Sequence, residues 1–235
     1  MAVLRRRDDP LVRKEAPSSD LETAGFTLRR DVVNVEDRDL LLRLTTPAAI
    51  SSAVRHRAGA AFAARGLLRK LPELARQLEA CGIDALASTV LGDRAVPIDA
   101  TFFDKHARAN WTVPGHQDRI MAVAGNTGRK HRIRDGVAYA EPDAETLAGL
   151  VALRIHFDAT DAGTGALCVV PGSHRNGVMT SGQILEVPLE RYVPCAACAG
   201  DVLVLRPLLL HRSSPSRGDG QRRVLHVVYA TNELL

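Results

Sequence analysis

Residues 200–205, Gly-Asp-Val-Leu-Val-Leu, give the clearest indication of the fold, because a short apolar run follows a Gly-Asp pair and stops at Arg206-Pro207. Runs of this length bounded by turn residues predict β-strands. Similar runs recur after Gly92, and they predict strands over residues 96–103, 117–124, 150–158, 166–170, 201–205 and 223–230. The later part of the chain is therefore expected to consist mainly of strands.

The segment before Gly92 has a helical pattern instead. From about Asp37 to Leu91, apolar residues recur with a period of about 3.6 residues. We expect one helix within residues 48–68, a second that begins at Pro72 and ends at Cys81-Gly82, and a third over residues 83–91. Helices followed by many strands predict an α+β fold, in which a double-stranded β-helix (a jelly-roll or cupin-like core) is packed on one side by an N-terminal helical layer.

The chain of 235 residues has the length of one domain. Residues 1–20 are charged and contain two prolines, which predicts a flexible tail, and residues 21–235 are expected to form the single domain with its helical lead-in over about 37–91. Residues 127–145 are polar and poorly patterned. They predict a long loop at the mouth of the barrel, either a lid or inert surface.

The charge balance is mildly basic, with a net charge of +4 and a pI near 9.1. Basic and acidic residues alternate, so we expect no nucleic-acid partner, whereas a small anionic substrate is compatible with the excess. No apolar run is long enough to span a bilayer and the N-terminus does not resemble a secretory signal, which predicts a cytoplasmic protein that binds no membrane. The four cysteines do not form a disulfide or zinc pattern, and Cys195-Ala-Ala-Cys198 is expected to be a loop. The oligomeric state is not predicted.

Two His-x-Asp motifs precede a later histidine, His211. They are His116-Gln117-Asp118 and His156-Phe157-Asp158, and either could complete a set of two imidazoles and one carboxylate. This set is typical of mononuclear non-haem Fe(II) sites that keep open positions, and it also suits Zn²⁺. Spacing along the chain allows both motifs. The first follows a Val-Pro-Gly loop, where functional groups concentrate, and is favoured on that ground.

Three blocks of sequence together resemble the phytanoyl-CoA dioxygenase family of Fe(II)- and 2-oxoglutarate-dependent oxygenases. The resemblance begins near residue 90 and extends to the C-terminus. The blocks are Phe103-Asp104-Lys105 with Asn110-Trp111 and His116-Gln117-Asp118; residues 167–175, Leu-Cys-Val-Val-Pro-Gly-Ser-His-Arg; and residues 200–211 with Arg222-Arg223-Val224-Leu225-His226.

The resemblance implies a role for each matching residue. His116, Asp118 and His211 are expected to be the catalytic iron ligands, and Arg222 to bind 2-oxoglutarate through a bidentate pairing with a carboxylate. Other side chains are assigned to two groups: Ser213, Gln117 and Lys105 near the cosubstrate, and His156, Trp111 and His226 near the substrate. The implied reactants are Fe(II), 2-oxoglutarate and O₂, with ascorbate in support.

The expected function is therefore an Fe(II)- and 2-oxoglutarate-dependent dioxygenase that hydroxylates a small or medium organic metabolite and releases succinate and CO₂. The same iron site could instead give desaturation, cyclisation or epimerisation, and a jelly roll that binds a metal or metabolite without turnover is a further alternative. A zinc hydrolase would lack a general base. Halogenase chemistry is disfavoured, because Asp118 occupies the position where a halide would bind. Gly115 and the absence of a tryptophan near residues 130–136 depart from the family pattern.

Overall fold

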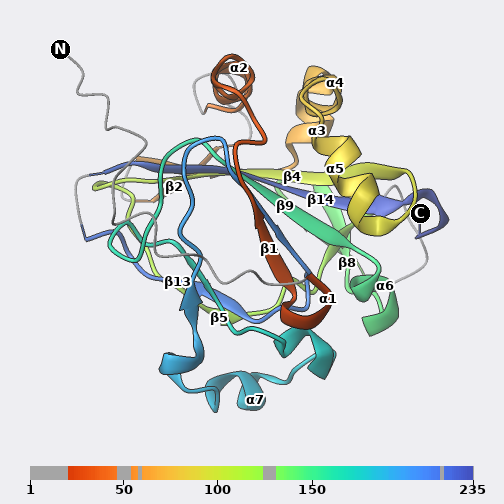
Figure 1. Cartoon of the computed structure of the whole chain (residues 1–235), viewed down its shortest axis with the longest axis vertical. Coiled ribbons are helices and arrows are strands. Elements are labelled where there is room, and N and C mark those ends of the chain that lie inside the picture. The colour runs from red at the N-terminus through yellow and green to blue at the C-terminus, as the bar shows by residue number, and fades with distance from the viewer. Residues whose placement is uncertain (1–20, 47–53, 58–59, 124–130, 218–219, 235) are drawn as a thin grey trace.

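In the computed structural model, two β-sheets face each other and helices cover the outer face of the larger sheet (Figure 1). The structure describes residues 21–46, 54–57, 60–123, 131–217 and 220–234. This arrangement confirms the predicted α+β class and the jelly-roll core with its helical layer. The predicted tail, residues 1–20, lies outside the described residues, and the single-domain assignment stays a prediction.

The larger sheet has seven antiparallel strands, and many residues that line the cavity described below lie on its central strands. In spatial order they are β1 (Phe26–Arg29), β12 (Val202–Leu205), β9 (Val151–His156), β14 (Arg222–Thr231), β4 (Ala95–Lys105), β3 (Ala60–Ala64) and β2 (Val54–Arg57). The facing sheet contains β11 (Val193–Pro194), β10 (Leu167–Val169), β13 (His211–Ser213) and β5 (Val113–His116). A third sheet consists of β6 (Met121–Ala122), β8 (Val137–Ala140) and β7 (His131–Arg134).

The helices α2 to α5 lie over one face of the large sheet, and α7 lies beyond the smaller sheet (Figure 1). The helices are α1 (Leu21–Ala24), α2 (Val35–Thr45), α3 (Leu67–Lys70), α4 (Pro72–Ala80), α5 (Ile83–Leu91), α6 (Ala144–Ala148) and α7 (Ser181–Leu185), with 3₁₀ turns η2 (Ser173–Asn176), η3 (Leu189–Arg191) and η4 (Asn232–Leu234). The predicted helices at Pro72 and Ile83 are confirmed: proline occupies the first turn of α4, and Gly82 and Gly92 flank α5 in the left-handed region. Among the described helices, none has both the length and the hydrophobicity that a bilayer crossing requires.

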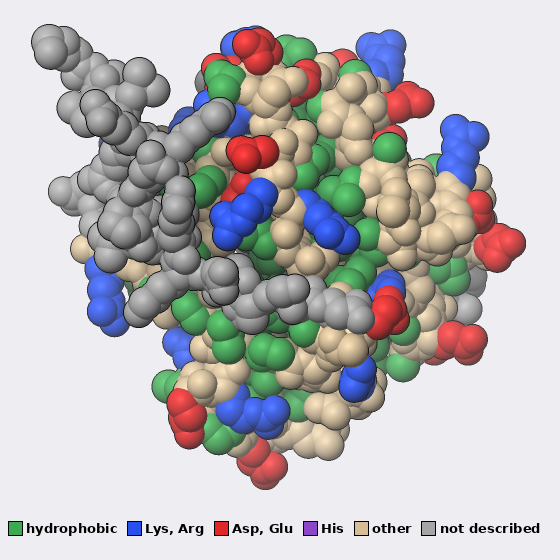
Figure 2. Space-filling model, in the orientation of Figure 1, with side chains coloured by type: hydrophobic (Ala, Val, Ile, Leu, Met, Phe, Trp, Pro, Cys, Tyr) green, Lys and Arg blue, Asp and Glu red, His purple; other side chains and the backbone are tan. Residues whose placement is uncertain are grey.

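Strand β14 shows how the sheet separates a core from a cavity. Leu225 and Val227 pack with helical residues such as Leu74 and Leu78 in the main core cluster, whereas Arg222 and His226 line the cavity on the other side. Side chains two apart on a strand point to the same face, so one strand supplies both surfaces. On the side of the molecule seen in Figure 2, basic and acidic side chains are interspersed, as the sequence indicates.

Three predictions of local structure were wrong in part. Residues 54–57 and 60–64 of the predicted helix 48–68 form strands, because β3 pairs with β4 and this tertiary pairing overrides the helix propensity of alanine. Of the predicted strand 117–124, Met121–Ala122 is extended. The predicted loop 127–145 contains the hairpin β7–β8 and the start of α6, and its residues 127–130 are outside the described part of the chain.

Candidate active site

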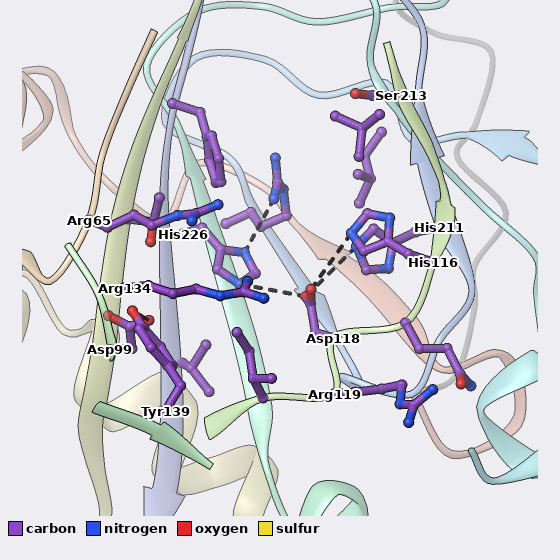
Figure 3. A pocket seen from close by; sticks show the side chains of 18 of the residues that line it. Arg65, Asp99, His116, Asp118, Arg119, Arg134, Tyr139, His211, Ser213 and His226 are labelled. Atoms are coloured by element: carbon purple, nitrogen blue, oxygen red, sulfur yellow. Dashed lines mark hydrogen bonds and ion pairs between the residues drawn. The ribbon is translucent and has the colours of Figure 1, made fainter. Parts of the chain in front are cut away.

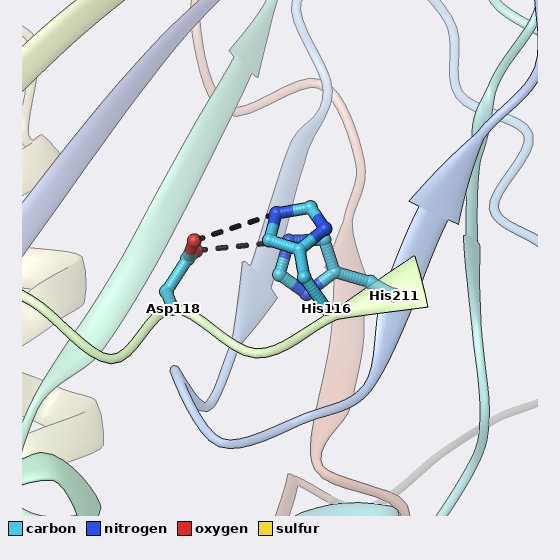
Figure 4. Close-up of side chains that lie close together, drawn as sticks. All are labelled: His116, Asp118 and His211. Atoms are coloured by element: carbon cyan, nitrogen blue, oxygen red, sulfur yellow. Dashed lines mark ion pairs between the residues drawn. The ribbon is translucent and has the colours of Figure 1, made fainter. Parts of the chain in front are cut away.

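His116, Asp118 and His211 come together where strands β5 and β13 pair (Figure 4). His116 and His211 are direct cross-strand partners, and their ring centroids are 4.2 Å apart. One possible ligand atom from each of the three residues lies within 4.8 Å of the others. The motif extends past the end of β5, because the strand ends at His116 and the Asp118 amide donates to the Pro207 carbonyl at 2.9 Å.

The two imidazoles are oriented by backbone carbonyls. Nδ1 of His116 is 2.9 Å from the Pro114 oxygen, and Nδ1 of His211 is 2.8 Å from the Leu209 oxygen. These contacts require Nδ1–H donors, so each Nε2 is a free acceptor, and each Nε2 lies 3.7 Å from an Asp118 carboxylate oxygen. Such a distance is too long for a hydrogen bond and leaves space for a cation between the atoms. Hydrogen bonds from Nδ1 to a backbone carbonyl, as both histidines make here, are common around metal-binding histidines.

The electrostatics also fit a divalent metal. Burial lowers the pKa of His211 to about 4, which keeps its imidazole neutral and able to coordinate at neutral pH. Burial alone would raise the pKa of Asp118, but the adjacent His211, His226 and His116 outweigh it and lower that pKa. A carboxylate and two imidazoles beside a cavity are the donor set of a non-haem Fe(II) site.

The second His-x-Asp motif has a different environment. The Asp158 carboxylate accepts two hydrogen bonds from the Arg223 guanidinium, at 2.8 and 2.6 Å, and a third from the Arg223 backbone. His156 is buried, its Nδ1 has no partner among the described residues, and it is not among the cavity-lining residues. Arg223 is thus an ion-pair residue on the opposite face from Arg222.

Gln117 ties the metal-binding loop to two other segments. Its amide nitrogen donates to the Gly177 and Leu208 carbonyls at 2.8 and 2.7 Å, and its oxygen accepts from the Met179 backbone at 2.8 Å. Both amide hydrogens are used by the protein itself, so the side chain has none to offer to a cosubstrate. Its geometry is that of a positioning residue.

Three buried cations lie near one end of the cavity: Arg154 and Arg222 line it, and Lys105 contacts Ser213 and Trp111, which line it too. Burial is the main cause of the lowered pKa of each group. It lowers the pKa of Arg154 to about 10 although the Asp118 charge opposes the fall, whereas nearby arginine charges add to the effect of burial at Lys105, with a pKa of about 7, and at Arg222, with a pKa of about 9. Within the described part of the chain, neither Lys105 nor Arg222 forms an ion pair with a carboxylate. Unpaired buried charges are costly, which favours an anionic ligand at this end.

Neighbouring polar groups shape this cationic end. The Lys105 ammonium donates to the Ser214 carbonyl at 2.7 Å and to the Ser213 hydroxyl at 3.3 Å, and it lies 5.0 Å from the centroid of the Trp111 ring. Nη1 of Arg222 donates to the Gly165 carbonyl at 2.8 Å, while its buried Nε has no partner among the described residues. This Nε is a donor that a bound carboxylate could use.

His226 and Arg154 connect the cationic end to Asp118. Nη1 of Arg154 is 3.2 Å from Nδ1 of His226, whose Nε2 is 3.8 Å from an Asp118 oxygen. All three residues line the cavity, as do the predicted Trp111 and Ser213. Arg154 was missed by the sequence analysis, although a charged residue inside the apolar strand run 150–158 was a usable signal.

The cavity has a volume of about 440 Å³ and extends past Asp118 to a second group of polar residues (Figure 3). Arg65, Asp99, Arg134 and Tyr139 lie on the side of Asp118 away from His116 and His211. The Tyr139 hydroxyl donates to the Asp99 carboxylate at 2.8 Å. Burial raises the pKa of Asp99, and the Tyr139 hydrogen bond and the charge of Arg65 oppose that rise. These residues were also missed, because they come from three strands, β4, β7 and β8, and from the segment after β3, with no common motif.

Comparison with protein families gives one match. The model described as "Phytanoyl-CoA dioxygenase (PhyH)" matches residues 23–224. The search of curated proteins gave no match.

Comparison with solved structures supports the fold. EctD from S. alaskensis, in its apo form, superposes with a TM-score of 0.69 at 16% identity, over 96% of this chain and 79% of that chain. AviO1 from Streptomyces viridochromogenes Tue57 gives a TM-score of 0.61 at 20% identity, over 90% and 92%. The non-haem α-ketoglutarate-dependent epimerase SnoN from nogalamycin biosynthesis gives 0.65 at 16% identity, over 95% and 84%.

Proposed function

The chain belongs to the phytanoyl-CoA dioxygenase family of Fe(II)- and 2-oxoglutarate-dependent oxygenases, and from this premise we propose that His116, Asp118 and His211 bind the iron and that Arg222, with Ser213 and Lys105, binds 2-oxoglutarate. The observation that carries the proposal is the position of the buried cations beside the His-Asp-His cluster in one cavity. A metal-binding face and an anion-binding end are the two parts that this chemistry needs.

Each group has a defined task in the proposed reaction. The imidazoles of His116 and His211 and the Asp118 carboxylate would hold the metal beside the cavity. Arg222 offers its unpartnered Nε and its planar guanidinium to the distal carboxylate of 2-oxoglutarate. Lys105, which donates a hydrogen bond to the Ser213 hydroxyl, supplies a second positive charge. The iron supplies the activation of O₂ that no side chain here can perform.

The apolar surroundings complete the site. Leu167, Val228 and Phe103 line the cavity together with the polar residues and limit water around the reacting groups. In the hydroxylation, 2-oxoglutarate and O₂ are converted to succinate and CO₂, and one oxygen atom enters a C–H bond of the substrate. We assign Trp111 and His226 to the substrate side of the cavity, and we assign to the protein a small-molecule substrate and a cytoplasmic location.

The decisive experiment combines metal binding with product analysis. Purified protein should form succinate from 2-oxoglutarate in the presence of Fe(II), ascorbate and O₂, and His211→Ala should lose both this activity and tight Fe(II) binding under anaerobic conditions. Asp158→Asn is the matched control, because it alters the second His-x-Asp motif and should retain metal binding. Zinc-dependent hydrolysis without O₂, or Fe(II) binding that survives His211→Ala, would contradict the assignment.

Mass spectrometry of a converted substrate separates the possible outcomes at the iron. Hydroxylation adds one oxygen atom, desaturation or ring closure removes two hydrogens, and epimerisation leaves the mass unchanged. We expect the added oxygen to carry the label when the reaction is run under ¹⁸O₂.

A further inference from the structure

Two cross-strand pairs, one from each of the facing sheets, meet at the Asp118 carboxylate. The smaller sheet supplies His116 and His211 from β5 and β13. The larger sheet supplies Arg154 and His226, which are direct partners on β9 and β14. The Nε2 atoms of the three histidines lie 3.7, 3.7 and 3.8 Å from Asp118 carboxylate oxygens. One carboxylate therefore faces three imidazoles, of which the proposed metal site uses two (Figure 3).

Arg154 determines which nitrogen of His226 carries the hydrogen. A guanidinium has donors and no acceptor, and Nη1 of Arg154 is hydrogen-bonded to Nδ1 of His226 at 3.2 Å. Nδ1 must therefore be the acceptor, and it carries no hydrogen. Because an imidazole keeps at least one N–H, the hydrogen is on Nε2, the atom that faces Asp118.

His116 and His211 have the opposite tautomer. Their Nδ1 atoms donate to backbone carbonyls, so their Nε2 atoms present lone pairs to Asp118. His226 presents an N–H at the equivalent atom, and a nitrogen that carries a hydrogen has no lone pair for a metal. His226 is also outside the group whose ligand atoms lie within 4.8 Å of one another. Two observations thus exclude it as a third nitrogen ligand.

Packing holds the Arg154–His226 pair in this arrangement. The guanidinium carbon of Arg154 lies 5.8 Å from the centroid of the Phe103 ring. The same ring meets the His226 imidazole edge-on, with centroids 6.5 Å apart. Side chains restricted by such contacts can hold a neighbouring group in place. Asp118 requires such a neighbour, because it follows the last residue of β5 and the strand ladder does not fix it.

We propose that Arg154 and His226 are positioning residues for the metal ligand Asp118: Arg154 fixes the tautomer of His226, and the Nε2–H of His226 donates toward the carboxylate. The inference rests on the proposed function, because it requires Asp118 to bind the metal. The present 3.8 Å is longer than a hydrogen bond, and a movement of roughly 1 Å or less would form one. His226 still lines the cavity, so this role adds to its place on the substrate side.

NMR of the metal-free protein tests the tautomer directly. Long-range ¹H–¹⁵N spectra of protein with ¹⁵N-labelled histidine distinguish a ring nitrogen that carries a hydrogen from one that does not. The His226 signals are those absent from His226→Gln. We expect the hydrogen of His226 on Nε2, and those of His116 and His211 on Nδ1. Arg154→Met removes the donor to Nδ1 and should populate the other tautomer of His226. A hydrogen on Nδ1 of His226 in the wild type, or a tautomer unchanged by Arg154→Met, would overturn the inference.

Two substitutions of His226 separate positioning from packing, and they do not depend on whether Arg154→Met folds. His226→Phe keeps an aromatic ring beside Phe103 and removes the N–H. His226→Gln loses the ring but keeps an N–H near the place of Nε2 and an oxygen that can accept from Arg154. We expect the Mn(II) affinity, measured by calorimetry, to fall by about 10- to 100-fold in His226→Phe and to stay within about threefold of wild type in His226→Gln.

A packing role predicts the reverse order of the two variants, and that result would overturn the inference. Equal Mn(II) affinity in wild type and His226→Phe would overturn it too. His106→Phe is the matched control, because His106 does not line the cavity and its substitution should leave Mn(II) binding unchanged.

Failure of the inference and failure of the proposed function give different results. When Mn(II) binding is lost in His211→Ala and unchanged in His226→Phe, only the positioning role is refuted. When the wild type binds no Mn(II), the proposed metal site is refuted, and the inference with it, because Asp118 then has no metal to bind.

Discussion

We expect the buried position of Lys105 to make the affinity for 2-oxoglutarate dependent on pH. Burial first, and the charges of Arg222 and Arg154 second, lower the Lys105 pKa from 10.5 to about 7. A bound dianion stabilises the protonated ammonium, so binding raises this pKa toward its ordinary value. By linkage, the affinity is highest below pH 7, where the lysine is already charged, and it decreases as pH rises through 7.

The size of the effect follows from the two pKa values. At pH 8 about nine tenths of the free protein would carry neutral Lys105, and the complex would be almost fully protonated, so binding takes up about 0.9 proton. At pH 6 the uptake falls to about 0.1 proton. Between pH 7 and pH 8.5 the dissociation constant should rise about 16-fold in all, which corresponds to about 1.6 kcal/mol.

Calorimetry on Mn(II)-loaded protein, in buffers with different ionisation enthalpies, measures both the affinity and the number of protons taken up. Lys105→Met should give weaker binding at pH 6, little pH dependence up to pH 8.5 and almost no proton uptake. Lys70→Met is the matched control, because the Lys70 ammonium is exposed and contacts only the Asp135 carbonyl among the described residues. Wild-type binding at pH 8 without proton uptake, or a pH profile unchanged by Lys105→Met, would refute the reasoning.

Three further predictions concern the same cavity. Arg222→Gln should weaken 2-oxoglutarate binding by about 2–5 kcal/mol, or roughly 30- to 4,000-fold, because it removes a buried charge partner; Mn(II) affinity measured alongside should be nearly unchanged, and equal losses of both would contradict the assigned role. Asp158→Asn should lower the free energy of unfolding by about 1–3 kcal/mol in urea titrations, since it weakens the ion pair with Arg223, and a simultaneous loss of metal would count against the chosen ligand set. Gly115→Ala places a methyl group against the Tyr192 hydroxyl and should lower the free energy of unfolding by about 1–3 kcal/mol. The double variant with Tyr192→Phe should recover part of this loss. An unaltered melting curve for the single variant would contradict the prediction, because it would mean that Tyr192 moves aside at no cost.

The fold could be predicted where local sequence and tertiary packing agree. Pro72 begins α4, and Gly82 and Gly92 flank α5. The apolar faces of both helices pack against the sheet, so both helices were predicted with nearly correct ends. The strand β3 shows the opposite case, because five residues rich in alanine have no intrinsic preference for a strand. Their conformation is set by pairing with β4, a contact between segments that the sequence pattern does not link.

The hairpin over residues 131–140 contains an Asp-Gly pair that favours a tight turn, but the polar residues around this pair led to the prediction of a loop. Asp135 and Gly136 both have positive φ, 52° and 80°, which is the requirement of the tight turn that Asp-Gly pairs favour between strands. The flanking strands are rich in arginine and alanine and lack the alternation of a half-buried strand, so the segment was interpreted as a loop. Its polar character has a structural reason, since one of these arginines faces the cavity.

The choice between the two His-x-Asp motifs required spatial information. Both motifs have suitable residue types, and the family resemblance favoured His116 and Asp118 for iron. The structure adds a physical contrast: Asp118 faces two free imidazole nitrogens, and Asp158 is saturated by Arg223. The residues of the far end of the cavity could not be predicted, because Arg65, Asp99 and Arg134 become neighbours only when three chain segments meet.

The three hydrogen bonds of the Gln117 amide have a consequence for how the protein acquires its metal. They hold the segment between the two proposed ligands His116 and Asp118 against backbone groups of Gly177, Met179 and Leu208. The spacing of the two ligand side chains on either side of Gln117 is therefore held by hydrogen bonds of the polypeptide itself, so a change at Gln117 would alter metal binding without removing a ligand.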